Sequence, residues 1–280
     1  MPLLLAACGP AEPGQQARPA MWLVEDDDTY IYMLGTMHAL PRGTDWDDGK
    51  VAGAIAAADE LVLELPPEEL VAAGAIFQAL APRSAPLAMD KRLPADALAR
   101  YRALEASGGD FGGDKLDDWA VMVLMGQRVA QNAELMPSKG VEAGLTATFE
   151  AAGKPVGGLE TAREQLMLFE TLDPQTQRVL LTRAAAKADK AVQDVDALTA
   201  AWTRGDIAAL EKLINEDIDV VPAARAAIIT DRNRRWAAWI KQRMAQPGTV
   251  MLAVGAGHMV GSDGVPAMLE AEGIKVTRVQ

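Results

Sequence analysis

Short apolar runs separated by turn residues open the sequence and predict strands. The runs at 20–25 and 29–34 flank three aspartates, a pattern typical of a β-hairpin with an acidic turn. Residues 50–58 are small and apolar enough for a helix, and the run at 60–65 is a short strand stopped by two prolines. Because a strand, a helix and a strand follow one another, we expect a crossover unit of a parallel sheet.

Helical periodicity dominates the middle of the chain. Apolar residues recur at helical spacing over 67–80, 94–107, 116–135, 161–172 and, in long stretches, 174–246. A brief strand is predicted near 154–159, where glycines and a proline interrupt the pattern. The run at 249–258 is the clearest buried strand, and a helix over 264–273 and a strand over 274–280 follow it.

These elements predict an α/β fold, with a mixed central β-sheet flanked by helices and a large helical insert. Half of the 280 residues are hydrophobic, mostly alanine, leucine and valine with few aromatics, which suits helices packed on a sheet. The length suffices to bury a full core. We therefore expect a single domain over 20–280, whose helical insert runs from about 67 to 246 and is interrupted by the strand near 154–159.

The formal net charge of −12 narrows the range of partners. Such an acidic chain repels phosphate-rich molecules, so no nucleic-acid partner is expected. The single cysteine, Cys8, excludes a disulfide within the chain and a metal site built from cysteines. No stretch reaches 18 uninterrupted apolar residues, so no membrane-spanning helix is predicted.

The residues before Cys8 resemble a bacterial lipobox, in which small residues precede a cysteine that is lipidated after cleavage. We interpret residues 1–19 as a lipoprotein-like signal remnant followed by a tether rich in glycine, proline and glutamine. The apolar run is only about five residues, shorter than the usual core of a signal peptide, and a start site assigned too far downstream would explain this. Lipidation predicts a periplasm-facing lipoprotein of the bacterial cell envelope; the alternative is a frayed tail with an incidental cysteine.

The two histidines of the chain stand in matching contexts. His38 and His258 each follow a predicted strand, and each has a glycine three residues before it, Gly35 and Gly255. A glycine where a strand gives way to a loop permits a tight turn and the close approach of other atoms. Each histidine is therefore expected to project from the carboxyl end of its strand.

Two glutamates, Glu64 and Glu160, close two further predicted strands. Ligands bind at the carboxyl ends of strands in open α/β sheets, so these carboxylates and both histidines are expected at one edge if the strands share a sheet. Imidazoles and carboxylates are ligands for zinc, manganese, cobalt or iron, and an open position would acidify a bound water. The alternatives are structural: hydrogen-bonded histidines, Glu64 capping the next helix, and Glu160 beside a helix start that Thr161 caps.

Other motifs carry less weight. The glycines around His258 do not form Gly-x-Gly-x-x-Gly, because Val260 occupies the third glycine position, so dinucleotide binding is not predicted. No serine lies in a Gly-x-Ser-x-Gly context. The acidic residues 25–28 are interpreted as a solvated hairpin turn rather than a cation site.

Several segments resemble the TraB/GumN family: MLGTMHALP, LVLEL, KGVEAGL, AAGKPVGGLET followed by a glutamine, and VGAGHMVGSDGVPAMLEAEGIKV. The resemblance covers nearly all of 20–280 in the family's order, and the paired Gly-x-x-His motifs are its most specific part. The family is similar to the Tiki metalloproteases and, more distantly, to erythromycin-esterase-like and ChaN-like proteins. This implies a shared α/β core with the site at the strand ends.

The resemblance also implies roles for individual residues. It implies that His38 and His258 are metal ligands or catalytic bases and that Glu64 is a ligand or general base. In the segment DRNRRW, it implies that Arg232 and Asn233 bind a developing oxyanion or orient the substrate. The alternative for Arg232 is an ordinary charge on a helix surface.

An envelope-associated, metal-dependent hydrolase with peptidase-like activity is the leading hypothesis, with manganese, cobalt or zinc as its cofactor. Its substrate would be a peptide or another small extracytoplasmic molecule, and it would contact the membrane only through a lipid anchor. The alternative is a non-catalytic binding or regulatory protein of the envelope that handles secreted peptides or polysaccharide machinery. The sequence leaves the oligomeric state open.

Overall fold

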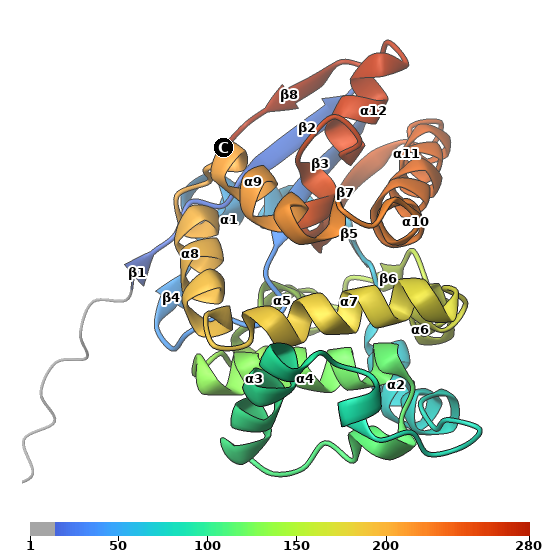
Figure 1. Cartoon of the computed structure of the whole chain (residues 1–280). Coiled ribbons are helices and arrows are strands. Elements are labelled where there is room, and N and C mark those ends of the chain that lie inside the picture. Colours follow the sequence, from blue (N-terminus) through green and yellow to red (C-terminus); the bar gives the residue numbers. More distant parts are fainter. Residues whose placement is uncertain (1–14) are drawn as a thin grey trace, which may run out of the picture.

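A computed structural model describes residues 15–280, except for the side chains of 15 and 216–218. Its centre is a six-stranded mixed sheet in the order β6-β5-β7-β3-β2-β8 (Figure 1). The strands are β2 (Met21–Glu25), β3 (Thr29–Thr36), β5 (Glu60–Leu63), β6 (Val156–Gly158), β7 (Gly248–Gly255) and β8 (Val276–Arg278). A separate two-stranded parallel sheet joins β1 (Gln15–Gln16) to β4 (Thr44–Asp45).

Four adjacent strands of the central sheet run parallel. β3 pairs with β7, β7 with β5, and β5 with β6. β2 forms an antiparallel hairpin with β3, and β8 pairs antiparallel with β2. Thr36 and Gly255 are register partners at the ends of β3 and β7, so the chain leaves both strands at the same level. The carboxyl ends of the four parallel strands therefore meet at one edge of the sheet.

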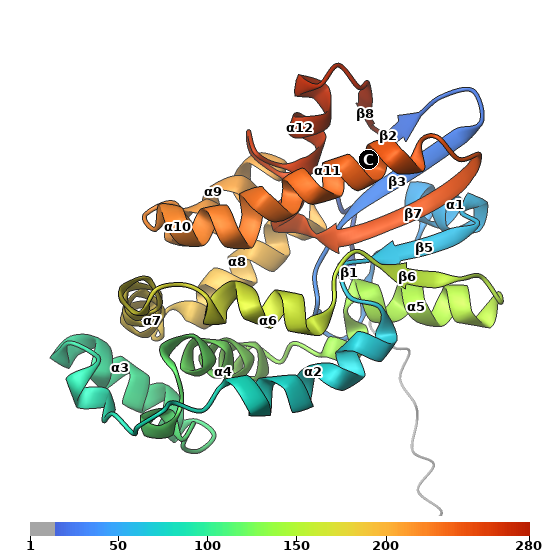
Figure 2. The same ribbon diagram turned by 90° about the vertical axis from the view of Figure 1, so that its right-hand side faces the viewer.

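Helices bury both faces of the central strands. β7 is a nearly continuous apolar run, as expected for a strand that is covered on both sides. One face packs against α1 (Gly49–Ala57), α5 (Val141–Ala151), α8 (Ala191–Thr203) and α9 (Ile207–Ile218). The other face packs against α11 (Asp231–Arg243) and α12 (Val265–Ala271), as Figures 1 and 2 show.

A second group of helices lies beside the carboxyl edge of the sheet (Figure 2). It consists of α2 (Pro67–Leu80), α3 (Ala95–Ala106), α4 (Asp118–Asn132), α6 (Ala162–Glu170) and α7 (Pro174–Lys187). α3, α4 and α7 share an apolar core of their own, which includes Tyr101, Met125 and Leu181. Short turns complete the chain: η1 (Met89–Lys91), η2 (Gly113–Lys115), η3 (Pro137–Lys139), α10 (Pro222–Arg225), η4 (Ala226–Thr230) and η5 (Ala256–Met259).

The structure confirms the mixed α/β fold and corrects several boundaries. The strand predicted over 249–258 ends at Gly255, and His258 lies in the 3-10 turn η5. The helix predicted over 116–135 spans only α4, and Glu134 beyond it has a φ of 56°. β1 and β4 were not predicted because their residues are polar and show no apolar alternation. The helices of 67–246 divide between the sheet faces and the second group, and none within 15–280 is long and apolar enough to span a bilayer.

Candidate functional site

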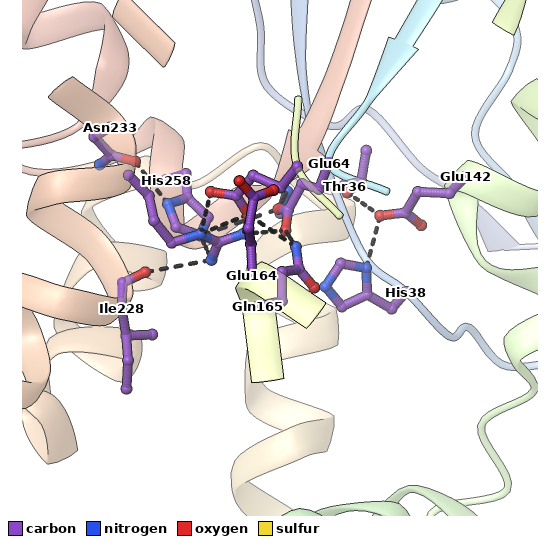
Figure 3. Close-up of polar contacts among 12 residues, drawn as sticks. Thr36, His38, Glu64, Glu142, Glu164, Gln165, Ile228, Asn233 and His258 are labelled. Atoms are coloured by element: carbon purple, nitrogen blue, oxygen red, sulfur yellow. Dashed lines mark hydrogen bonds and ion pairs between the residues drawn. The ribbon is translucent and has the colours of Figure 1, made fainter. Parts of the chain in front are cut away.

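The carboxyl edge of the sheet gathers His38, His258 and Glu64, as Figure 3 shows. The second predicted glutamate, Glu160, joins them through Arg232. Gly255 marks the point where three of them meet. A Cβ atom built on Gly255 would lie 3.1 Å from Glu64 Oε1 and 3.7 Å from both His38 Nε2 and His258 Cδ2. Because His38 Nε2 and His258 Cδ2 each lie 3.7 Å from this Cβ position, they are separated by at most twice that distance. A side chain at position 255 would fill the space that these groups share.

His38 presents one ring nitrogen to this space and anchors the other on a carboxylate. Its Nδ1 lies 2.7 Å from Glu142 Oε1, which also accepts a hydrogen bond from the Thr36 hydroxyl. The His38 side chain is 72% exposed, and its Nε2 faces Gly255. Desolvation by the surrounding protein disfavours the charged ring, but the hydrogen bond and negative charge of Glu142 prevail and raise the pKa of His38 to about 9.

Tight backbone packing brings Glu142 to His38. The first residue of α5, Val141, donates its N–H to the Met37 carbonyl at 3.0 Å. A Cβ at Gly140 would lie 2.1 Å from the His38 carbonyl oxygen, so only glycine fits between this loop and the start of α5. Glu142 Oε2 is buried without a hydrogen-bond partner among the described residues. This contact was not predicted, although KGVEAGL was among the family-like segments.

The pKa of His258 is shifted in the opposite direction from that of His38. Asn233 donates its Nδ2 to the Asp263 carbonyl at 2.7 Å, which leaves its Oδ1 to accept from His258 Nδ1 at 2.6 Å. This pairing assigns the proton to Nδ1 and a lone pair to Nε2. The side chain is buried, and burial lowers the pKa of His258 to about 4 although Glu64 opposes the shift. The ring is therefore neutral at pH 7.

Arg232 links three of the predicted residues through its guanidinium group. Its Nη2 donates to Glu64 Oε2 and Glu160 Oε2, each at 2.7 Å. Its Nε donates to both oxygens of Glu160 at 3.0 Å, and its Nη1 donates to His258 Nε2 at 2.9 Å. The residue is only 6% exposed, so it is not an ordinary helix-surface charge. A cation with five N–H groups in a fixed fork suits this bridging position better than lysine would.

A local irregularity positions Arg232. The π-helical turn η4 (Ala226–Thr230) directly precedes α11, and the Ile228 carbonyl in that turn accepts from Arg232 Nη1 at 3.3 Å. One turn further along α11, the Trp236 ring lies 4.7 Å from the Arg232 guanidinium carbon and 4.5 Å from the centre of the His258 ring. π-helical turns are frequent at functional sites. Trp236 therefore packs against both groups and restricts their movement.

Glu64 is held in its ionised form. The Gly255 N–H donates to its Oε1 at 2.6 Å, and Gln165 Nε2 donates to its Oε2 at 3.1 Å. Burial alone would raise the pKa of this carboxyl, but the facing charges, those of His258 when protonated and of Arg232, lower it to about 2. Its Oε1 lies 4.0 Å from His258 Nε2. Glu64 is therefore an anionic group beside the space at Gly255.

Glu160 lies behind Arg232. In addition to its bonds with that guanidinium, it accepts from Arg235 Nη2 at 3.1 Å and from Gln165 Nε2 at 3.1 Å. Glu160 is 7% exposed, and Thr161 beside it forms a reciprocal capping box with Glu164 at the start of α6. Its metal-ligand role stays a prediction, because its carboxylate oxygens are engaged by donors in this arrangement. Gln165, which bridges the two glutamates, is the glutamine that follows AAGKPVGGLET in the family-like segments, and the sequence assigned it no role.

The donor set can be tested against the metal that the sequence predicts. Both imidazoles are anchored through Nδ1. His38 Nε2 faces Gly255, whereas His258 presents Cδ2 there and its Nε2 accepts from Arg232 Nη1, 4.0 Å from Glu64 Oε1. Two imidazoles and a carboxylate fit zinc, manganese or cobalt. Within residues 15–280, no group of three or more histidine, cysteine, aspartate or glutamate side chains already has the spacing of a coordinated ion. Ligation by His258 would require Arg232 Nη1 to leave Nε2.

Comparison with known proteins places the chain in a family. A sequence model described as the TraB/PrgY/gumN family matches residues 20–278. No curated protein and no solved structure gives a significant match. The predicted likeness to erythromycin-esterase-like and ChaN-like cores thus stays a prediction. Because the family match covers nearly the whole chain, including both Gly-x-x-His turns, this protein belongs to the TraB/PrgY/gumN family.

Proposed function

We propose that the protein is a metal-dependent hydrolase with peptidase-like activity, in which His38, His258 and Glu64 hold one divalent ion. The observation that carries the proposal is the matched anchoring of the two imidazoles. Each binds a polar partner through Nδ1; His38 Nε2 then faces Gly255, and His258 Nε2 lies 4.0 Å from Glu64 Oε1, where it accepts from Arg232 Nη1. Metal-binding histidines almost always have such a partner on the second nitrogen, because it fixes the tautomer and the ring orientation.

A divalent manganese, cobalt or zinc ion supplies Lewis acidity toward a carbonyl oxygen and lowers the pKa of water. The chain's own residues supply the rest. Glu142 lines the cavity beside His38, and its buried Oε2 has no hydrogen-bond partner among the described residues. A small rotation of this carboxylate would let Oε2 take a proton from an attacking water and pass it to the leaving amine. The water oxygen bonds to the carbonyl carbon as the C–N bond breaks. Arg232 provides a buried positive charge next to the developing oxyanion.

Positioning residues complete this arrangement. Asn233 uses both ends of its amide, one on His258 and one on the Asp263 carbonyl, so it orients the imidazole. Glu160 holds the guanidinium of Arg232 through both carboxylate oxygens. Asn233 is completely buried, so it does not reach a substrate oxyanion in this arrangement. We therefore assign Asn233 and Glu160 to orientation in this proposal.

One observation favours the second candidate, a non-catalytic binding or regulatory protein of the envelope. Arg232 already neutralises Glu64 and Glu160 and donates to His258 Nε2. A buried charge network that is satisfied without a metal can serve architecture alone. The histidines would then hold the two turns in place.

Metal content separates these candidates. We expect wild-type protein loaded with zinc, manganese or cobalt and then desalted to retain about one equivalent by elemental analysis, and to gain thermal stability from it. His38→Ala should lose the metal and keep its fold, because the side chain is exposed. The exposed Glu270→Gln variant on α12 is the control and should retain the metal. A peptide-library screen of the same proteins then reports cleavage.

Wild-type protein that holds no metal above background would contradict the hydrolase proposal and favour the architectural role. Unchanged metal content in His38→Ala would contradict the ligand assignment alone. Peptide cleavage that persists after complete metal removal would contradict metal dependence.

We also propose that the protein is anchored in the cell envelope through a lipid on Cys8. This position lies outside the described residues, so the support is the lipobox-like sequence alone. Cells grown with labelled palmitate should yield labelled protein, and Cys8→Ser should abolish the label. A native mass that matches the unprocessed chain would contradict the proposal.

A further inference from the structure

A cavity of about 580 Å³ opens beside the site. His38, Glu64 and Glu142 line the part of it that lies at the site. The proposed hydrolytic centre therefore faces directly into it. A substrate that reaches His38 must place part of its structure in this cavity.

The walls come from two helices and are mostly apolar. On one side, Leu65, Pro67 and Leu70 line the cavity at the start of α2. Leu70 is 56% exposed, so its side chain is accessible to a ligand. On the other side, Ala143 and Ala147 present small side chains from α5. These walls suit an aliphatic segment of a ligand rather than a polar one.

The outer end of the cavity carries a free carboxylate. Glu150 lines the cavity eight positions after Glu142 on α5, a rise of about 12 Å along the helix. It is exposed, and within the described part of the chain no cationic side chain pairs with it. Lys154, the next lysine along the chain, instead donates to the carbonyls of Ala56 and Ala58. Glu150 thus differs from Glu64 and Glu142, whose charges are already paired.

Because both residues lie on α5, the Cα–Cβ bonds of Glu142 and Glu150 tilt alike, toward the N-terminus of the helix. The two carboxylates therefore mark positions about 12 Å apart along the wall that α5 forms. No lysine or arginine is among the described residues that line the cavity.

We propose that this cavity is a specificity pocket for a lysine or arginine side chain of a peptide substrate, with Glu150 as the residue that selects it. The proposal rests on the proposed function for the identification of the occupant as a substrate. Lysine and arginine have apolar stems and charged heads, which match apolar walls that end in a carboxylate. The formal net charge of −12 attracts cationic peptides over longer distances and acts in the same direction.

Binding rather than cleavage tests the pocket, so the result does not depend on the metal chemistry. Fluorescein-labelled alanine-based hexapeptides carry lysine, norleucine or glutamate at each position in turn. Norleucine keeps the aliphatic stem of lysine and removes its charge. Dissociation constants are measured by fluorescence anisotropy with the full chain in a chelator, for wild type, Glu150→Gln, Glu150→Lys and the control Glu270→Lys. Glu270 is exposed on α12, so the control makes the same change in net charge outside the pocket.

At one position, wild type should bind the lysine peptide about fivefold more tightly than the norleucine peptide at low salt. The preference should vanish in Glu150→Gln, reverse toward glutamate in Glu150→Lys and persist in Glu270→Lys. It should also shrink at high salt, because an exposed ion pair is screened. Equal binding of lysine and norleucine peptides at every position, lysine preference that survives Glu150→Lys, or no binding at about 1 mM would each overturn the pocket.

The two proposals fail separately. Charge-selective binding through Glu150 in a protein that never holds metal would leave the pocket in place and remove the hydrolase. Metal-dependent cleavage with no lysine or arginine preference, unaffected by Glu150→Lys, would do the reverse.

Discussion

The two Gly-x-x-His turns begin from equivalent positions on neighbouring parallel strands and end in opposite electrostatic states. His38 is exposed, its Nδ1 contacts the carboxylate of Glu142, and its pKa rises to about 9. His258 is buried, its Nδ1 contacts the amide of Asn233, and its pKa falls to about 4. The motif therefore fixes where each imidazole lies, whereas its charge is set by the carboxylate of Glu142 at His38 and by burial at His258.

This difference has a consequence for the proposed metal site. A neutral His258 has a lone pair on Nε2, whereas His38 must lose a proton before it can bind a metal. Arg232 occupies the lone pair of His258, and no protein group is hydrogen-bonded to His38 Nε2 among the described residues. Each turn therefore presents a different obstacle to ligation, a guanidinium on one side and a proton on the other.

Removal of Arg232, which occupies Nε2 of His258, should change the stability of the protein more than any other substitution that we propose. Arg232→Ala leaves Glu64 and Glu160 buried without their main cation, so we expect the free energy of unfolding to fall by about 3–5 kcal/mol. Urea denaturation followed by circular dichroism measures this loss. The control is Arg234→Ala on the same helix, whose exposed ion pair with Asp231 should be worth at most about 1 kcal/mol. Equal losses in the two variants would show that Arg232 does not hold the site together.

Conversion of the partner of His258 to a carboxylate should make it resemble His38. In Asn233→Asp, a negative charge at Nδ1 should raise the pKa of His258 by about 1–3 units. The new carboxylate also faces the Asp263 carbonyl, so we expect some loss of stability as well. NMR titration reports the pKa, and His38→Ala assigns the two imidazole signals. An unchanged pKa would mean that burial alone controls His258.

The reciprocal change places a neutral amide at Nδ1 of His38, as Asn233 does at His258. Glu142→Gln removes the charge that raises the pKa of His38, so this pKa should fall from about 9 toward the ordinary value of 6.5. The same NMR titration measures it. Thr36→Val is a milder companion, because it removes only the hydroxyl that also donates to Glu142. A pKa that stays near 9 in Glu142→Gln would exclude Glu142 as its cause.

The smallest expected effect is the pH dependence of stability in metal-free protein. The folded-state pKa of His38 lies above 6.5, so its contact with Glu142 stabilises the fold fully below pH 6.5 and is lost as the pH rises through about 9. The pKa of His258 lies below 6.5, so its contribution is present above pH 6.5 and is lost as the pH falls toward about 4. Because solvent screens the exposed His38, its share should not exceed about 1 kcal/mol.

Urea denaturation between pH 4 and 10 measures both limbs of this profile. His38→Ala should flatten the alkaline limb and leave the acidic limb in place. An alkaline limb that is unchanged in this variant would assign the loss to other groups.

Much of the fold followed from local patterns. The alternation and length of apolar runs identified the hairpin, the crossover unit, α2 and the buried β7, because these elements satisfy their hydrophobic and turn requirements within a few residues. The end of β7 was placed too late, since the apolar pattern continues into the 3-10 turn that holds His258. The division of the helices between the sheet and the second group has no local signature, because it depends on which faces meet.

Spacing at the strand ends determined which chemical groups gather in the site. A glycine followed three residues later by a histidine, and a glutamate at the end of a short strand, are local features that a parallel sheet brings to one edge. Only the tertiary structure decided how those groups are charged. Glu142 lies 104 positions from His38 in the sequence, and Arg232 lies 168 positions from Glu64, yet each pair is in contact. Likewise, nothing in the sequence around Glu150 indicates that its carboxylate lines a cavity. Electrostatic interactions depend on distance and burial in space, and neither is encoded in the separation of residues along the chain.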